Sequence, residues 1–368
     1  MKTNQHHFAE TEGKRDGYTD GLSYGYHHGR CEAILSNTPR VSPIKWELNV
    51  LYVGSNNGLP YVPIDHGIVE ALGSLVREVR HCVPTDDIVG LVQAWRPHLV
   101  LVLDCVHSVT VDRVDAIRSL GVKTAVWFPD DPYYTDVTVH VSLHYDYVFT
   151  SELNMVQFYN ELGCPQVYYL PFATSTAVFR PSKMEPAYRS EICFLGTAYW
   201  NRVALFDSIA DYLAERNVVI VGYWWDRLKN YSRLKDKIRL GAWLTPQETL
   251  KYYCGAKIVM NLHREPGDPS INQNSFAIPA LSVNPRTFDI CSSGAFQLTD
   301  VRDDLHSLYM AGHEVSTFSS TSDLIYKLDY FLYHEEERRQ IALRGLSRTL
   351  QQHTFLARLQ QMLQAVWT

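Results

Sequence analysis

The chain has 368 residues, of which 46% are hydrophobic and 20% are charged, and its formal net charge is −6. This length predicts about two domains, and the composition excludes a disordered protein. The slightly acidic balance provides no basic surface for nucleic acid or for an anionic membrane, so we expect neither as a partner.

Seven cysteines are widely spaced along the chain, and no C-x-x-C pair occurs. This pattern indicates free thiols in a reducing compartment rather than a disulfide framework or a zinc site. No apolar run reaches the roughly 18–20 residues of a membrane span, and no signal-peptide core stands near the first residue. We therefore expect a cytoplasmic protein without a membrane span and without a bound metal.

Residues 1–47 form an N-terminal arm rich in glycine and tyrosine, and its first twelve residues are expected to be disordered. Five glycines recur at every fourth position from Gly13 to Gly29, so on a helix they would share one face. Glycine costs about 1 kcal/mol per helical position, so such a helix would be weak alone. Two interpretations stay open: close packing against another helix, for example in a homodimer, or a poorly ordered arm.

An N-terminal domain is expected over residues 48–180. Short apolar strands alternate there with helices, which is typical of a parallel sheet that is buried on both faces. The expected strands are 48–54, 99–104, 123–128, 146–150 and 166–170, and the expected helices are 68–79, 86–95, 111–120 and 152–162.

After a proline-punctuated connection at 171–189, the same alternation restarts in a C-terminal domain over residues 190–350. Its expected strands are 191–196, 217–222, 256–261, 295–298 and 314–318, and its expected helices are 200–215, 226–239, 246–254, 285–293, 321–333 and 335–350. A polar loop fills 263–283, and a last helix at 354–366 lies in a C-terminal segment, 351–368. The fold class is therefore α/β, with two Rossmann-like, doubly wound parallel-sheet domains.

Ligands of open parallel sheets bind at the carboxyl ends of the strands. After the first strand stand Ser55, Asn56 and Gly58, in a turn that is not a complete G-x-G-x-x-G, so it is either a ligand loop or a plain turn. After the strand at 123–128 stand Asp130 and Asp131, either of which could act as a general base or orient a hydroxyl. The alternative is that Asp131 caps the following turn and Asp130 is solvated.

The first strand of the C-terminal domain ends at Gly196 and Thr197, just before a helix that carries Arg202. A glycine between a strand end and a helix N-terminus is a ready anion site, and Arg202 could reach a diphosphate bound there. The alternative is an ordinary surface arginine.

The segment 256–300 is the most informative part of the chain. Asn261 and His263 stand at a strand end, and Asn284 is a fitting N-cap for the next helix. Arg286 would lie in the first turn of that helix, where a cation is unfavourable unless it meets an anion, so we expect a phosphate nearby. Asp289 is on the same helical face and could bind ribose hydroxyls, whereas the alternative is an i,i+3 ion pair between Arg286 and Asp289.

The motif NPRTFDICSSGAFQLTD, Asn284–Asp300, resembles the C-terminal motif of spore-maturation CgeB-like glycosyltransferases. The stretches AKIVMNLH from Ala256, FLGTAYWNR from Phe194 and WFPDDP from Trp127 resemble the same family, over roughly residues 48–345. The resemblance implies a GT-B fold, in which two Rossmann-like domains face a cleft. It also implies that the C-terminal domain holds most of the donor nucleotide and that the last helix crosses back to the N-terminal domain.

The implied activity is transfer of a sugar from a nucleotide diphosphate sugar, with a UDP-sugar as the first choice, to an unidentified acceptor. No further cofactor is implied, and the adjacent Asp130 and Asp131 are not the D-x-D of metal-dependent transferases. The alternatives are a nucleotide-sugar epimerase on the same fold, or a non-catalytic nucleotide-sugar-binding or scaffold protein of a spore or cell-surface layer.

By this resemblance Asp289 takes the place of a longer ribose-binding acid, and the lysine that related enzymes pair with an arginine has no obvious counterpart. The predicted catalytic residues are Asp130, Asp131 and Arg202; the predicted donor-binding residues are Gly196, Thr197, Asn261, His263, Asn284, Arg286 and Asp289; and the predicted acceptor or sugar side is Ser55, Asn56 and Gly58.

Overall fold

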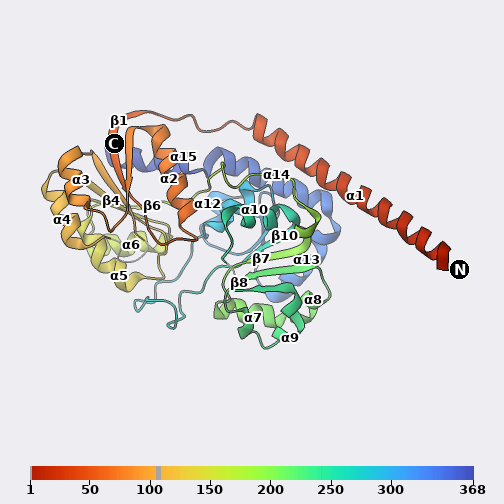
Figure 1. The fold of residues 1–368 in the computed structure, drawn as a ribbon. Helices are drawn as coiled ribbons and strands as arrows, with labels where there is room; N and C mark the ends of the chain where they lie inside the picture. The colour runs from red at the N-terminus through yellow and green to blue at the C-terminus, as the bar shows by residue number, and fades with distance from the viewer. Residues whose placement is uncertain (1, 105–108, 242) are drawn as a thin grey trace.

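The computed structural model describes residues 2–104, 109–241 and 243–368. Two lobes lie side by side, each built on a six-stranded parallel sheet, and a long helix, α1 (Lys2–Asn37), extends away from the second lobe (Figure 1). No helix within the described ranges is both long enough and apolar enough to cross a membrane.

The first lobe has the strand order β2-β1-β3-β4-β5-β6. Its central strand β3 is buried along its whole length, because helices cover both faces of the sheet. The strands are β1 (Trp46–Val53), β2 (Val76–Cys82), β3 (Leu99–Leu103), β4 (Lys123–Phe128), β5 (Tyr147–Thr150) and β6 (Val167–Tyr169), and the helices are α2 (Val62–Leu75), α3 (Ile88–Trp95), α4 (Val111–Ser119), α5 (Thr135–Val141) and α6 (Leu153–Leu162).

The second lobe has the order β12-β11-β10-β7-β8-β9, so the chain winds outward from β7 in one direction and, from β10, in the other. A crevice forms at such a reversal, where the connections leave the sheet on opposite faces. The strands are β7 (Ser190–Leu195), β8 (Val218–Gly222), β9 (Ile238–Leu240), β10 (Ala256–Asn261), β11 (Gln297–Asp300) and β12 (Ser316–Phe318). The helices are α7 (Trp200–Ser208), α8 (Ala210–Ala214), α9 (Tyr231–Leu234), α10 (Pro246–Gly255), α11 (Arg286–Ser292), α12 (Leu305–Leu308), α13 (Thr321–Tyr333) and α14 (Glu335–Gln352).

The last helix, α15 (Phe355–Trp367), lies in the first lobe against α2 (Figure 1). The contact is close, since a Cβ at Gly67 of α2 would stand 2.5 Å from the Phe355 ring. Two backbone hydrogen bonds of Thr174 fix the segment that leads into α15. The Thr174 N–H donates to His353 O (3.0 Å), and the Thr174 carbonyl accepts from Phe355 N (3.2 Å). These contacts hold the two lobes together beside the cleft.

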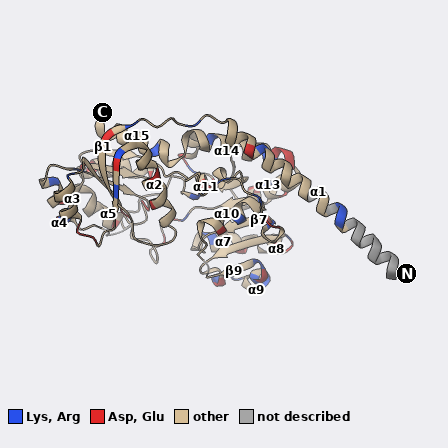
Figure 2. Ribbon diagram, turned by 45° about the horizontal axis from the view of Figure 1, so that its top comes forward, with Lys and Arg blue, Asp and Glu red and all other residues tan. Residues whose placement is uncertain are grey.

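The N-terminal arm is helical, and its C-terminal part packs against α14, as Figures 1 and 2 both show. Cys31 is buried there among leucines of α14, and Arg30 pairs with Glu336 at 2.9 Å. The five-glycine stripe makes no close contact, because no described atom lies within 4 Å of a Cβ built at any of these glycines, although Gly21 and Gly25 line a cavity that α14 also lines. The arm therefore packs against a helix of the same chain, but not through its glycine stripe as the sequence pattern suggested, and the disorder expected for its first twelve residues was wrong, since α1 begins at Lys2.

Three predicted elements were wrong. The helix expected at 68–79 ends at Leu75, because Val76–Cys82 pairs in parallel with β1 as an edge strand. The helix expected at 226–239 is replaced by short turns and β9, with Trp225 and Leu234 buried. The helix expected at 200–215 breaks at Ile209 into α7 and α8, and α5 was not predicted.

Candidate active site

A cavity of about 500 Å³ lies between the lobes, at the carboxyl ends of β4 from the first lobe and of β7 and β10 from the second. This volume is within the roughly 300–1,000 Å³ of small-molecule sites. From the second lobe the wall includes the predicted residues Gly196, Thr197, Arg202, His263, Asn284, Arg286 and Asp289; from the first it includes Tyr61, Asp130, Asp131, Tyr133 and Tyr134.

Two guanidinium groups converge at Gly196. A Cβ at this glycine would stand 3.0 Å from Arg202 Nη1 and 3.2 Å from Arg286 Nη2. Neither arginine forms an ion pair with any described carboxylate: Arg202 donates to the carbonyls of Leu262 (2.7 Å) and Thr197 (2.9 Å), and Arg286 donates to the amide oxygen of Asn261 (3.0 Å).

Arg202 is only 3% exposed. Burial, together with the positive charge of Arg286, lowers the pKa of Arg202 to about 9, so the group is still a cation at neutral pH. The cavity wall therefore holds two neighbouring positive charges, neither of which is in an ion pair within the part of the chain that the structure describes.

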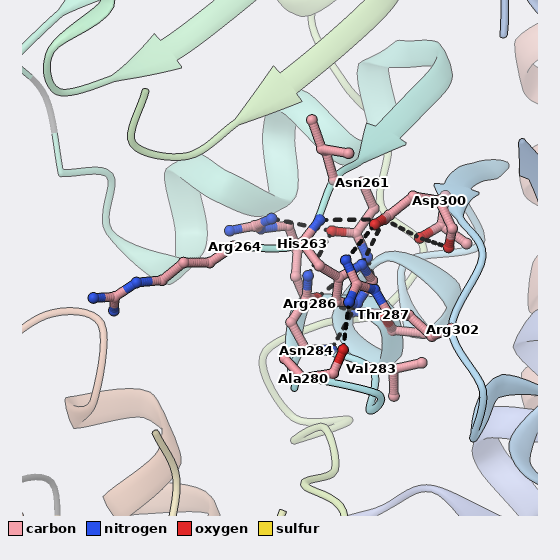
Figure 3. Close-up of polar contacts among 12 residues, drawn as sticks. Asn261, His263, Arg264, Ala280, Val283, Asn284, Arg286, Thr287, Asp300 and Arg302 are labelled. Carbon is pink, nitrogen blue, oxygen red and sulfur yellow. Dashed lines mark hydrogen bonds and ion pairs between the residues drawn. The ribbon is translucent and has the colours of Figure 1, made fainter. Parts of the chain in front are cut away.

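Arg286 is held in place by Asn261, whose amide is the centre of a polar cluster (Figure 3). The Asn261 Oδ1 accepts from Arg286 and from Asn284 Nδ2 (2.9 Å), while Nδ2 donates to Gln297 (2.9 Å) and Thr287 (3.0 Å). Asn261 was predicted to bind the donor directly. Because its hydrogen-bonding groups are used within the protein and it is absent from the cavity wall, it instead positions Arg286.

His263 has a similar supporting role. Its Nε2 accepts from Asn284 N (2.9 Å), so Nδ1 carries the proton and donates to Asp300 Oδ1 (2.5 Å). Asp300 in turn pairs with Arg302 at 2.6 Å. Burial lowers the pKa of His263, which keeps the ring neutral, and both ring nitrogens are occupied. His263 therefore fixes the start of α11 instead of contacting a ligand through its nitrogens.

The start of α11 is close to the predicted one. Asn284 Oδ1 accepts from Thr287 N at 3.2 Å, so Asn284 caps the helix by its side chain, and the regular helix begins at Arg286. The capping bond orients the first turn, so that Arg286 and Asp289 both face the cavity.

Asp289 lies in the cavity wall without an ion pair to Arg286, so the i,i+3 surface pair is not formed among the described residues. Its Oδ1 accepts a hydrogen bond from Thr174 Oγ1 at 2.8 Å. Burial raises the pKa of Asp289 to about 7, and the Thr174 hydroxyl and the Arg286 charge only partly offset it. A carboxylate in this position can accept hydrogen bonds from ligand hydroxyls.

The two adjacent aspartates of the first lobe differ in surroundings. Asp131 is 5% exposed and accepts from the hydroxyls of Thr150 (2.7 Å) and Tyr159 (3.0 Å), so its oxygens are used within the lobe. Asp130 accepts from Tyr61 at 2.5 Å and faces the cavity. Burial raises the pKa of both carboxyls, that of Asp131 to about 7. The oxygens of Asp131 are thus bonded within the lobe although the residue also lines the cavity, whereas Asp130 accepts only from Tyr61 among the described residues.

The predicted acceptor side was misplaced. Ser55, Asn56 and Gly58 lie outside the cavity wall. Ser55 donates to Asp65 through its N–H (3.1 Å) and its hydroxyl (2.9 Å), while Asn56 and Gly58 form an exposed turn with φ of 55° and 68°. This geometry agrees with the interpretation of the segment as a plain turn. The residues that reach the cavity come next in the chain: Leu59, Pro60, Tyr61, Pro63 and Ile64.

The predicted site residues did not include Tyr61, Tyr199 or Arg264, all of which line the cavity. The Arg264 guanidinium lies 4.5 Å from the Tyr133 ring centroid and 4.8 Å from that of Tyr199. Arg264 points away from the cluster around Asn261 (Figure 3). Its position directly after His263 at the end of β10 was the available signal, whereas nothing near Tyr61 in the sequence indicates a site.

Comparisons with known proteins agree with this architecture. A family model described as glycosyl transferase-like matches residues 202–364. Spore protein CgeB of Bacillus subtilis (strain 168) is 29% identical over 314 residues, which are 84% of this chain and 95% of CgeB.

Solved structures show the same fold. The catalytic domain of starch synthase IV from Arabidopsis thaliana, bound to ADP and acarbose, aligns with a TM-score of 0.63 at 8% identity, over 87% of this chain and 99% of that one. Anabaena HepE in complex with UDP-glucose aligns with a TM-score of 0.59 at 9% identity, over 87% of this chain and 99% of HepE. The chain is a glycosyltransferase with the GT-B fold. Its similarity to CgeB over most of both chains confirms the resemblance noted in its motifs.

Proposed function

We propose that this glycosyltransferase takes its sugar from a nucleotide diphosphate sugar, and that Arg202 and Arg286 hold the diphosphate. The supporting observation is the pair of guanidinium groups at Gly196, which has no described carboxylate partner. Neighbouring like charges repel, so a dianionic diphosphate between them would neutralise both and form charge-assisted hydrogen bonds.

The same groups would serve the reaction. When the bond between the anomeric carbon and the diphosphate oxygen breaks, negative charge builds up on the leaving diphosphate, and fixed cations stabilise it most at that point. The two arginines supply this charge, so the proposal includes no metal ion.

Asp289 stands one helical turn from Arg286 and is proposed to accept from the ribose hydroxyls of the donor. Asp130 lies across the cavity, with Tyr61 donating to it, and is proposed to receive the proton of the acceptor hydroxyl as its oxygen attacks the sugar. A UDP-sugar is the first choice of donor, and the solved Anabaena HepE complex with UDP-glucose supports it.

Calorimetric titration with UDP tests the proposal. Arg286→Ala removes one charge-assisted contact of about 1.5–3 kcal/mol, so we expect roughly 10- to 150-fold weaker binding. The free protein should lose little stability, because the substitution also relieves repulsion on Arg202 and leaves Asn261 bonded to Asn284. Arg40→Ala is the matched control at an exposed arginine outside the cavity.

Equal UDP affinity in the wild type and in Arg286→Ala would remove the arginine from the site. Turnover separates the remaining alternatives: an epimerase converts the donor sugar without any acceptor, whereas a non-catalytic scaffold releases no UDP under any condition.

A further inference from the structure

A second cavity, of about 410 Å³, lies where the N-terminal arm packs against the second lobe. One wall of this arm cavity comes from α1. The other walls come from the connection before β7, the junction of α10 and β10, the turn after α11 and the start of α14. Among the described residues, Tyr253 is the one that lines both this cavity and the active site, so the two are separate.

The wall of the arm cavity carries a surplus of positive charge. A single carboxylate lines it, that of Glu335, which pairs with Arg339 at 2.5 Å. No other ion pair joins the charged side chains of this wall in the part of the chain that the structure describes, so four cations stay without a carboxylate partner. The cations that line the cavity are Lys183, Arg189, Lys257, Arg338 and Arg339.

The amino groups of Lys183 and Lys257 are available to a ligand. Neither forms a hydrogen bond or an ion pair with any described residue, and Lys183 is exposed whereas Lys257 is half-buried. The Arg189 guanidinium lies 4.4 Å from the centroid of the Tyr24 ring, so an aromatic side chain of the arm holds this third cation at the wall.

Buried groups around the arm cavity add to its positive character. Arg338 is 4% exposed, and burial lowers its pKa to about 10, so it is still a cation at neutral pH. Burial lowers the pKa of His27 to about 4, and the charge of Arg339 lowers it further. The neutral His27 ring donates from Nε2 to Gly294 O at 3.0 Å, which joins the arm to the second lobe at the edge of this cavity.

The glycine repeat of the arm keeps the cavity open. Gly21 and Gly25 line it, and a Cβ built at either position meets no atom within 4 Å. A larger side chain would take up space there. Two of the five regularly spaced glycines thus border the place where the cations converge.

The charges and the size of the arm cavity define the chemistry of its ligand. Lysine and arginine are the side chains that bind phosphate, lysine as a compact charge and arginine as a planar fork. The volume suits a small molecule, and the cations converge on one cavity instead of spreading along a face as they do in nucleic-acid-binding proteins. A ligand with two or more negative charges would neutralise the unpaired cations.

We propose that the arm cavity binds a small polyanion, such as a phosphorylated metabolite, and that this ligand fastens the N-terminal arm to the second lobe. A ligand held between α1 and the lobe favours the docked arm, because binding to one state stabilises that state. The inference does not rest on the proposed function, since it involves neither Arg202 nor Arg286.

The first experiment is calorimetric titration of the full chain with pyrophosphate. All variants carry Arg286→Ala, which weakens the diphosphate site proposed in the active site. We expect pyrophosphate to bind, and Lys183→Ala combined with Lys257→Ala should weaken the binding by about tenfold or more, because two charge-assisted contacts are lost. Thermal stability without ligand should stay unchanged, since neither lysine has a partner among the described residues.

Lys229→Ala combined with Lys235→Ala is the matched control. It removes the same charge from two exposed lysines of the second lobe that line none of the described cavities, so pyrophosphate affinity should not change. Equal affinity of the two double variants for pyrophosphate, or no binding of pyrophosphate to the control, would overturn the inference.

Hydrogen exchange followed by mass spectrometry locates the probe. Pyrophosphate should slow the exchange of backbone amides in residues 21–31 of the arm, and the Lys183→Ala, Lys257→Ala variant should lose this protection. Protection of the active-site segments alone, with the arm unchanged, would contradict the proposal. Protection of the arm in a protein that does not bind UDP would support this inference and refute the proposed donor.

Discussion

The raised pKa of Asp289 makes donor affinity dependent on pH. The ionised carboxylate accepts hydrogen bonds from the ribose hydroxyls much more strongly than the neutral acid does, and burial raises the pKa of Asp289 to about 7. About one carboxyl in eleven is then ionised at pH 6 and about ten in eleven at pH 8. UDP-glucose should therefore bind roughly tenfold more tightly at pH 8 than at pH 6, a difference of about 1.4 kcal/mol.

Asp289→Asn isolates this effect, because the amide has the same shape and its oxygen can still accept from Thr174. The variant should bind UDP-glucose weakly and with a much flatter pH profile, since Asp130, Asp131 and the other titrating groups remain. The free variant should also gain stability relative to the wild type as pH rises toward 7. The folded-state pKa of Asp289 lies above its unfolded value, so ionising this buried carboxyl costs the wild type stability over that range.

The assay is isothermal titration with UDP-glucose at pH 6, 7 and 8, for the wild type and for Asp289→Asn. UDP-glucose is chosen over UDP because a terminal phosphate has a second pKa near 6, which would add its own pH dependence. A flat wild-type profile, or an equal slope in both proteins, would show that Asp289 does not bind the ribose.

Two further predictions concern the cavity wall. Asp130→Ala should reduce turnover by about 10²–10⁴-fold with unchanged UDP affinity and thermal stability, as for loss of a general base. Asp131→Ala should destabilise the fold by roughly 1–3 kcal/mol in denaturant unfolding, because it removes a buried acceptor of the Thr150 and Tyr159 hydroxyls. If Asp130→Ala and Asp131→Ala changed turnover and stability equally, the different roles assigned to the two aspartates would be refuted. Gly196→Ala should weaken UDP binding by about tenfold, because its Cβ would displace the guanidinium groups at 3.0 and 3.2 Å, while Gly29→Ala, which meets no atom within 4 Å, should not change it.

Most of the fold could be predicted from the sequence because the strands are short, apolar and regularly separated by helices. The strand expected at 123–128 and the helix at 321–333 were found with those bounds. The predicted elements were wrong where contacts with distant parts of the chain decide the local secondary structure. The polar edge strand β2 has no apolar pattern of its own, and the segment after Trp225 folds around two buried anchors rather than a helical face.

The site was predictable where a strand end and a helix start fix the backbone, as at Gly196, Arg286 and Asp289. It was not predictable where the course of a loop decides which side chains face the cavity. Ser55 and Tyr61 follow the same strand only six residues apart, yet Ser55 bonds to Asp65 and Tyr61 reaches Asp130. Likewise, the supporting roles of Asn261 and His263 depend on partners that come 21 to 37 residues later in the chain.

A crystal structure of the protein with bound UDP tests the central claim most directly. We expect the diphosphate oxygens within hydrogen-bonding distance of Arg286 and beside Gly196, with the ribose hydroxyls at Asp289. A diphosphate bound elsewhere, with no anion at the guanidinium groups of Arg202 and Arg286, would contradict the assignment of the donor site.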